Sequence, residues 1–207
     1  MSQAKTIPLW LRWAGLLWLV IWLPLYLWAW GWQNMMHVCD IAVILGCLGL
    51  WFQRTLLVSS QAISSLLAGV LWALDVGWRI VSGHPLVGGT EYMWDTHYAL
   101  GIRLLSTFHI ALPLVMIRSV QSIGYDRRAL VFQSGIMAAL LISSRFLPPQ
   151  LNMNYAYQDP LFHRAWGPAV THLAVIFVGA VAFFYWPADL LLRRMFPAAR
   201  DSDNQNK

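Results

Sequence analysis

The chain has 207 residues, of which 58% are hydrophobic and only 11% are charged. A soluble domain carries about 25% charged residues, and the 13 tryptophans are typical of membrane interfaces, where an apolar ring with a polar edge is favoured. The net charge of +5 does not indicate nucleic-acid binding, because the positive residues lie in short segments between apolar spans and form no basic face. The composition therefore predicts an integral membrane protein whose partners are membrane lipids, and it excludes nucleic acid.

Six apolar segments follow one another along the chain, each reaching or approaching the length of about 20 residues that a membrane-spanning helix needs. The first continues without a small-residue cleavage site, so we expect a retained helix and not a signal peptide. The pattern predicts an all-α polytopic membrane protein: one domain over residues 1–197 built as a bundle of six transmembrane helices, followed by a disordered cytoplasmic tail over residues 198–207. The expected helices span residues 9–31, 35–53, 56–79, 98–118, 129–147 and 167–191.

The distribution of lysine and arginine predicts the orientation, because these residues collect on the cytoplasmic side of a membrane. With the N-terminus inside, three arginines lie in outer loops and ten positive residues lie in inner segments, which predicts a bacterial inner-membrane protein with both termini in the cytoplasm. Two long loops, at about residues 80–97 and 148–166, then face outward, and loops of this length often carry function. The ten inner residues are Lys5, Arg12, Arg54, Arg118, Arg127, Arg128, Arg193, Arg194, Arg200 and Lys207.

Ionisable side chains inside apolar spans are costly and by default mark functional sites. At about 1.5 Å per helical residue, Asp40, Asp75, Arg103 and His172 each lie roughly 6–8 Å below the outer surface, whereas His109 lies near the middle of the membrane. Four polar side chains at one depth predict a shared pocket open to the outer leaflet. The structural alternative is that Asp75 or Asp40 pairs with Arg103 to hold helices together, and that His172 is a solvated interface residue.

The sequence His37-Val38-Cys39-Asp40 opens the second apolar segment. On a helix His37 shares a face with Asp40 and Cys39 points elsewhere, so a base for Cys39 has to come from another helix. His109 and His172 are the candidates, and a Cys–His pair would supply a nucleophilic thiolate. The alternative is that Cys39 is a small buried hydrophobe.

The remaining residue patterns favour neither a metal, nor a cofactor, nor a disulfide. Cys39 and Cys47 would lie about 12 Å apart on one helix, and a disulfide needs about 7 Å. No HExxH motif, clustered Cys/His set or glycine-rich phosphate loop occurs. A bis-histidine haem held by His109 and His172 is disfavoured because these residues differ in depth by roughly 9 Å, whereas His97 with His172 is still possible.

Three motifs in this order resemble those of the YwaF-like bacterial integral membrane proteins: His37-Val38-Cys39 in an early helix, His109 followed by Pro113, and Asn152-Met153-Asn154-Tyr155 before the last helix. Those proteins are similar to the polytopic acyltransferases that remodel ether phospholipids and, more distantly, to the androgen-induced membrane hydrolases of fatty-acid esters. The resemblance implies a six-helix lipid-modifying enzyme with Cys39 as the acyl-accepting nucleophile and His109 as its base. The chain departs from the family pattern where Asn34-Met35-Met36 replaces Leu-Pro-Leu and where Asp40 follows the cysteine.

Two classes of function stay open at this point, besides a purely structural subunit. The first is a lipid acyl-transferring or ester-hydrolysing enzyme that uses Cys39 and His109, with Asn154 or backbone amides stabilising the oxyanion. The second is a non-catalytic small transporter, lipid-binding or sensor membrane protein whose polar residues form a ligand site or a proton relay. The candidate binding residues in either case are His37, Asp40, Asp75, Arg103, Asn154 and His172.

Overall fold

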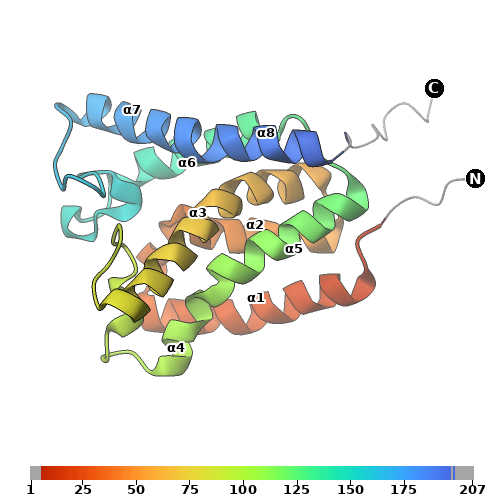
Figure 1. Cartoon of the computed structure of the whole chain (residues 1–207), viewed down its shortest axis with the longest axis horizontal. Helices are drawn as coiled ribbons and strands as arrows, with labels where there is room; N and C mark the ends of the chain where they lie inside the picture. Colours follow the sequence, from red (N-terminus) through yellow and green to blue (C-terminus); the bar gives the residue numbers. More distant parts are fainter. Residues whose placement is uncertain (1–5, 197, 199–207) are drawn as a thin grey trace, which may run out of the picture.

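The computed structural model describes residues 6–196 and 198, and in this part of the chain the protein is a bundle of helices that run back and forth, with no β-strand (Figure 1). The predicted all-α class is therefore confirmed, whereas the predicted tail lies outside the described residues except for Ala198. The α-helices are α1 (Leu9–Trp30), α2 (Val38–Phe52), α3 (Thr55–Ser82), α4 (Leu100–Leu104), α5 (Phe108–Ile123), α6 (Ala129–Ser144), α7 (Ala169–Ala180) and α8 (Trp186–Met195).

Four helical segments within the described residues are long and apolar enough to cross a membrane: α1, α3, the continuous run Leu100–Ile123 and the continuous run Ala169–Met195. The helices α2 and α6 are apolar but have only 15 and 16 residues. At about 1.5 Å per residue they are about 22–24 Å long, less than the roughly 30 Å of the hydrocarbon. All six predicted segments are helical, but the structure supports a membrane span by length for four of them.

Two of the long helical runs contain a turn of different pitch. The run that starts with α4 passes through a 3₁₀ turn, η3 (Leu105–Thr107), before α5, and the last run passes through a π-helical turn, η6 (Val181–Tyr185), between α7 and α8. The π turn buries Tyr185 at 4% exposure, where its hydroxyl meets Gln133 of α6 and Ser64 of α3. Polar side chains thus join three helices at the centre of the bundle.

Helix α3 lies in the middle of the bundle, against α2, α5, α6 and α8 (Figure 1). It approaches α5 closely at Gly69, where an added Cβ would stand 2.2 Å from the carbonyl oxygen of His109 and 3.1 Å from Cγ of Pro113. Small residues at helix crossings allow backbones to approach in this way. The absence of a side chain at Gly69 therefore fixes the distance between α3 and the start of α5.

The start of α1 and the end of α8 lie at one end of the bundle, and the two long loops lie together at the other end (Figure 1). We call this second end the loop end. The loop between α3 and α4 contains a short 3₁₀ turn, η2 (Glu91–Trp94), and the segment between α1 and α2 contains another, η1 (Trp32–Met36). Most of the polar residues singled out above lie at the loop end.

Candidate functional site

The first turn of α2 carries a small polar cluster. His37 precedes the helix in an extended conformation (φ −64°, ψ 138°), and Cys39 and Asp40 follow within the first turn. Asn34 donates from Nδ2 to Oδ2 of Asp40 at 2.8 Å, and the Cys39 thiol donates to Oδ1 of the same carboxylate at 3.9 Å. Asp40 is only 2% exposed, so it holds both the thiol and the preceding turn in place.

Apart from its own thiol, the backbone N–H of Cys39 has no acceptor in the described part of the chain. The neighbouring amides do have acceptors: Val38 donates to Oδ1 of Asn154 at 2.9 Å, and Asp40 donates to the carbonyl of His37 at 3.1 Å. Free amides in the first turn of a helix attract negative charge. A donor of this kind therefore stands beside the thiol of the same residue.

Asn154 connects the second long loop to the start of α2. Its Oδ1 accepts from Val38, and its Nδ2 donates to the carbonyl of Met36 at 2.7 Å and to Oγ of Ser144 at 3.0 Å. The backbone at Asn154 is left-handed (φ 52°), a conformation that asparagine tolerates better than most residues. Both amide protons and the oxygen are used, so this side chain positions α2 and has no donor left for an oxyanion.

His109 lies in the first turn of α5 with one ring nitrogen free. Nδ1 lies 2.8 Å from the carbonyl of Ser106, so Nδ1 carries the hydrogen and Nε2 carries the lone pair. The ring stacks on Trp72 with centroids 5.0 Å apart and an interplanar angle of 7°, and Phe108 covers its other side at 4.1 Å. No hydrogen-bond partner for Nε2 is found among residues 6–196 and 198, so this nitrogen can accept a proton.

His37, Cys39 and His109 share one environment. Each side chain is half-buried. His37 and His109 are close enough to interact electrostatically. No hydrogen bond joins Cys39 to His109 within the described residues, and the thiol contacts Asp40 instead.

Two tyrosine hydroxyls lie next to this cluster and were not predicted. Tyr26 of α1 shares a hydrogen bond of 2.5 Å with Oγ of Ser106, and Tyr92 of η2 accepts from Nε1 of Trp72 at 2.9 Å. Both hydroxyls lie within electrostatic range of Asp40. Through Tyr92, the loop between α3 and α4 reaches the stack that holds His109.

Asp75 does not join this cluster. Its Oδ1 accepts from the backbone amides of Leu86 at 2.8 Å, Val87 at 2.6 Å and Gly88 at 3.1 Å, and its Oδ2 accepts from the hydroxyl of Thr90. One buried carboxylate therefore organises the turn that precedes η2. The structure brings Asp75 to its own loop and to none of Asp40, Arg103 or His172.

Arg103 also holds the loop, and it forms no ion pair with Asp40 or Asp75 in the described part of the chain. Its Nη1 donates to the carbonyl of Met93 at 2.8 Å. Arg79 also contacts η2, with its guanidinium 4.4 Å from the centre of the Trp94 ring. The structural alternative of an Asp–Arg pair between helices is thus wrong for these residues.

His172 is 1% exposed, which contradicts the alternative of a solvated interface histidine. Its Nδ1 accepts from the backbone N–H of Trp166 at 3.2 Å, and its Nε2 donates to the carbonyl of Tyr155 at 2.9 Å. Both ring nitrogens hold the second long loop. His97, in contrast, is an exposed residue bonded to Asp95 at 2.7 Å, so these two histidines do not form a facing pair for haem.

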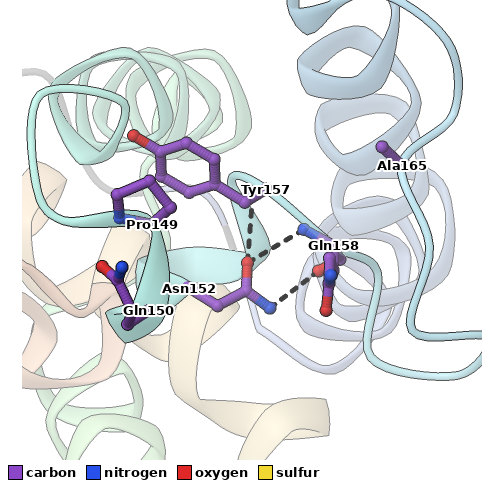
Figure 2. A pocket seen from close by; sticks show the side chains of 6 residues that line it. All are labelled: Pro149, Gln150, Asn152, Tyr157, Gln158 and Ala165. Carbon is purple, nitrogen blue, oxygen red and sulfur yellow. Dashed lines mark hydrogen bonds between the residues drawn. The ribbon is translucent and has the colours of Figure 1, made fainter.

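A shallow hollow of about 470 Å³ lies on the second long loop (Figure 2). Asn152 forms its floor, accepting from the amides of Tyr157 and Gln158 at 3.0 Å each and donating to the carbonyl of Gln158 at 2.9 Å (Figure 2). These polar groups bond to one another, and no ionisable or nucleophilic side chain other than the Tyr157 phenol lines the hollow. The candidate site is therefore the cluster around Cys39 and His109; the lining residues of the hollow are Pro149, Gln150, Asn152, Tyr157, Gln158 and Ala165.

No group of three or more His, Cys, Asp or Glu side chains that could hold a metal ion is found in the part of the chain that the structure describes. Comparison of the chain with models of protein families, with curated proteins and with solved structures gave no significant match.

Proposed function

We propose that this protein is an enzyme of the bacterial inner membrane that transfers or hydrolyses the acyl groups of lipids, with Cys39 as nucleophile and His109 as base. In this proposal six helices cross the membrane, both termini are cytoplasmic and the loop end faces outward. The observation that carries the proposal is the unused Nε2 of His109 in the same half-buried cluster as the thiol of Cys39, which Asp40 orients.

The chemistry would take two steps. Sγ of Cys39 attacks the carbonyl carbon of a lipid ester while its proton passes to Nε2 of His109, and the proton is then given to the departing alcohol oxygen as the C–O bond breaks. The products of this step are a thioester and an alcohol. Water or an acceptor alcohol then attacks the thioester, passes its own proton through His109 and restores the thiol.

The negative charge that forms on the carbonyl oxygen needs a fixed donor. Asn154 has none left, but the backbone N–H of Cys39 has no acceptor apart from its own thiol and lies at the N-terminus of α2. Asn154 serves this step indirectly, because it binds Val38 and Met36 and so sets the path of the chain into the first turn. Asp40 orients the thiol before attack.

The test is intact-mass spectrometry of the purified protein after incubation with phospholipid. We expect a hydroxylamine-labile acyl adduct on the wild type and on Cys47→Ala, which removes the other cysteine, and none on Cys39→Ala. His109→Gln should slow adduct formation about 100-fold or more, the usual loss when a general base is removed. An adduct that persists in Cys39→Ala, or no adduct on any variant, would refute acyl transfer through this cysteine.

The second candidate function is a non-catalytic transporter, lipid-binding or sensor protein. It is favoured by one observation: the thiol of Cys39 bonds to Asp40, and no hydrogen bond to His109 is found in the described residues. In this case Cys39→Ala would leave lipid binding or transport unchanged, whereas Asp40→Asn would alter it. A wild-type protein that binds lipid but forms no adduct would support this candidate over the first.

A further inference from the structure

Three buried side-chain donors at the loop end have no hydrogen-bond acceptor in the described part of the chain: Nε1 of Trp30, Nη1 of Arg79 and Nε of Arg103. All three residues surround the short turn η2. The Trp30 ring lies 5.7 Å from the ring of Tyr92, Arg103 binds the carbonyl of Met93, and Arg79 lies over Trp94. Three further buried donors without a hydrogen-bond partner are scattered over the described chain, in Arg12, Trp22 and Arg193, whereas these three all belong to residues that contact one turn. Because unpaired buried donors are costly, their grouping indicates a missing acceptor.

The missing acceptor is not a carboxylate of this loop. Glu91 accepts from the amide of Gly89 at 2.8 Å, and Asp95 accepts from the amide and the ring of His97 at 2.9 and 2.7 Å. Asp95 acts on Arg103 electrostatically without bonding to it. Neither Arg79 nor Arg103 has an ion pair among the described residues, so two guanidinium charges at the same turn stay unmatched by direct contact.

We propose that Arg79 and Arg103, with the indole N–H of Trp30, bind a phosphate group beside η2, and that this phosphate belongs to the headgroup of a phospholipid. Guanidinium groups bind phosphate oxygens through paired N–H donors, and the charge of the ligand matches theirs. The choice of a lipid over free phosphate rests on the function proposed above. It also agrees with the position of both arginines at the loop ends of long apolar helical runs.

The same turn joins this phosphate site to the candidate catalytic cluster. Met93 and Trp94 contact the arginines, whereas Tyr92 turns inward to Trp72 and lies within electrostatic range of Cys39. The turn has four residues and is about 8 Å long at the 3₁₀ rise of about 2 Å per residue. A phospholipid held by its phosphate beside η2 would therefore lie next to the turn whose Tyr92 side chain faces the candidate catalytic cluster.

The experiment uses full-length Cys39→Ala protein, which forms no thioester, so that binding is measured apart from chemistry. Native mass spectrometry compares retention of phosphatidylglycerol with retention of diacylglycerol, which has the same tails and no phosphate. We expect Arg79→Gln with Arg103→Gln to weaken phosphatidylglycerol binding about tenfold or more, the loss of at least one charge-assisted bond. Diacylglycerol retention should not change.

Arg164→Gln is the matched control, because Arg164 is also an arginine of the loop end stacked on an aromatic ring, 3.9 Å from the centre of Trp166. It should bind phosphatidylglycerol like the parent. Arg79→Lys with Arg103→Lys, which keeps both charges, tests folding and should retain more lipid than the glutamine variant. Equal retention by the parent and the glutamine variant, or equal losses in the control, would overturn the proposal.

Inorganic phosphate distinguishes the two sources of the ligand. If the site binds a lipid headgroup, millimolar phosphate should displace little phosphatidylglycerol. Tight binding of phosphate that the glutamine variant loses would assign the site to free phosphate and refute its assignment to a lipid. The outcomes also separate this proposal from acyl transfer. Arginine-dependent lipid binding in Cys39→Ala, without an acyl adduct on the wild type, would support the phosphate site and refute acyl transfer. An adduct on the wild type, with lipid binding that does not depend on the two arginines, would support acyl transfer and refute the phosphate site.

Discussion

Gly69→Ala is expected to destabilise the bundle and disturb His109 by adding a single methyl group. The new Cβ would lie 2.2 Å from the carbonyl oxygen of His109, so α3 and α5 must separate by about 1 Å to reach ordinary contact. Overpacking of this kind costs about 1–3 kcal/mol, against a gain of about 0.5–1 kcal/mol for replacing glycine in a helix. The net loss of about 1–2 kcal/mol corresponds to a fall in Tm of about 2–8 °C for a chain of this size.

Gly77→Ala is the matched control for this experiment. It lies on the same helix, and an added Cβ there meets nothing within 4 Å. Gly77→Ala should show only the stabilisation that comes from replacing glycine in a helix, and it should raise the Tm by about 1–4 °C. Thermal unfolding of both variants in one detergent measures the difference. If Gly69→Ala melts at or above the temperature of Gly77→Ala, α3 and α5 do not approach through Gly69 and the placement of His109 is wrong.

The remaining predictions concern residues that hold the loop end. Asp75→Ala should speed amide hydrogen exchange at residues 86–88 about 100-fold, because their shared acceptor is lost, while Asp95→Ala should leave it unchanged. Asn154→Ala should lower the free energy of unfolding by about 2–3 kcal/mol, measured by thermal or denaturant unfolding; a loss below about 0.5 kcal/mol would contradict its role in holding α2. Burial alone would raise the pKa of Asp159, but backbone N–H donors at 2.6–3.3 Å outweigh burial and hold the pKa below its ordinary value. The stability that Asp159 contributes to this turn is therefore complete above the unfolded pKa and is lost as the pH falls through the folded pKa. Hydrogen exchange of this turn should therefore rise only in strong acid, and Asp159→Asn should remove that pH dependence.

The hydrophobic pattern predicts the fold well, because apolar runs of about 20 residues leave few alternatives to helices. All six predicted segments are helical, and the largest error is at residues 98–118, where the helical run continues to Ile123. Hydropathy did not predict the changes of pitch at η3 and η6. These depend on partners from other helices, such as Gln133 and Ser64 for Tyr185, which no local pattern contains.

Depth along a helix was a poor guide to the site. Asp40, Asp75, Arg103 and His172 were grouped because they lie at similar depth, but depth leaves the direction of each side chain undetermined. In the structure Asp75 turns to its own loop, and His172 binds backbone groups of the second loop. The hydroxyl of Tyr92 was missed for the same reason, since a loop residue gives no sign in the sequence that it will reach Trp72.

The buried polar residues of the loop end fall into two groups, according to whether all of their polar side-chain atoms have hydrogen-bond partners. Asp75, Asn154 and His172 use every donor and acceptor that the described structure gives them, and a group without spare bonding capacity can position others but has nothing to offer a ligand. His109 and Arg103 each keep one nitrogen without a partner in the described residues. All five are costly to bury in an apolar environment without a partner, and the sequence does not show which of them find one. Unused bonding capacity therefore locates the candidate site between the start of α2, the start of α5 and η2, and it assigns the carboxylate of Asp75 to the scaffold that holds η2 over that site.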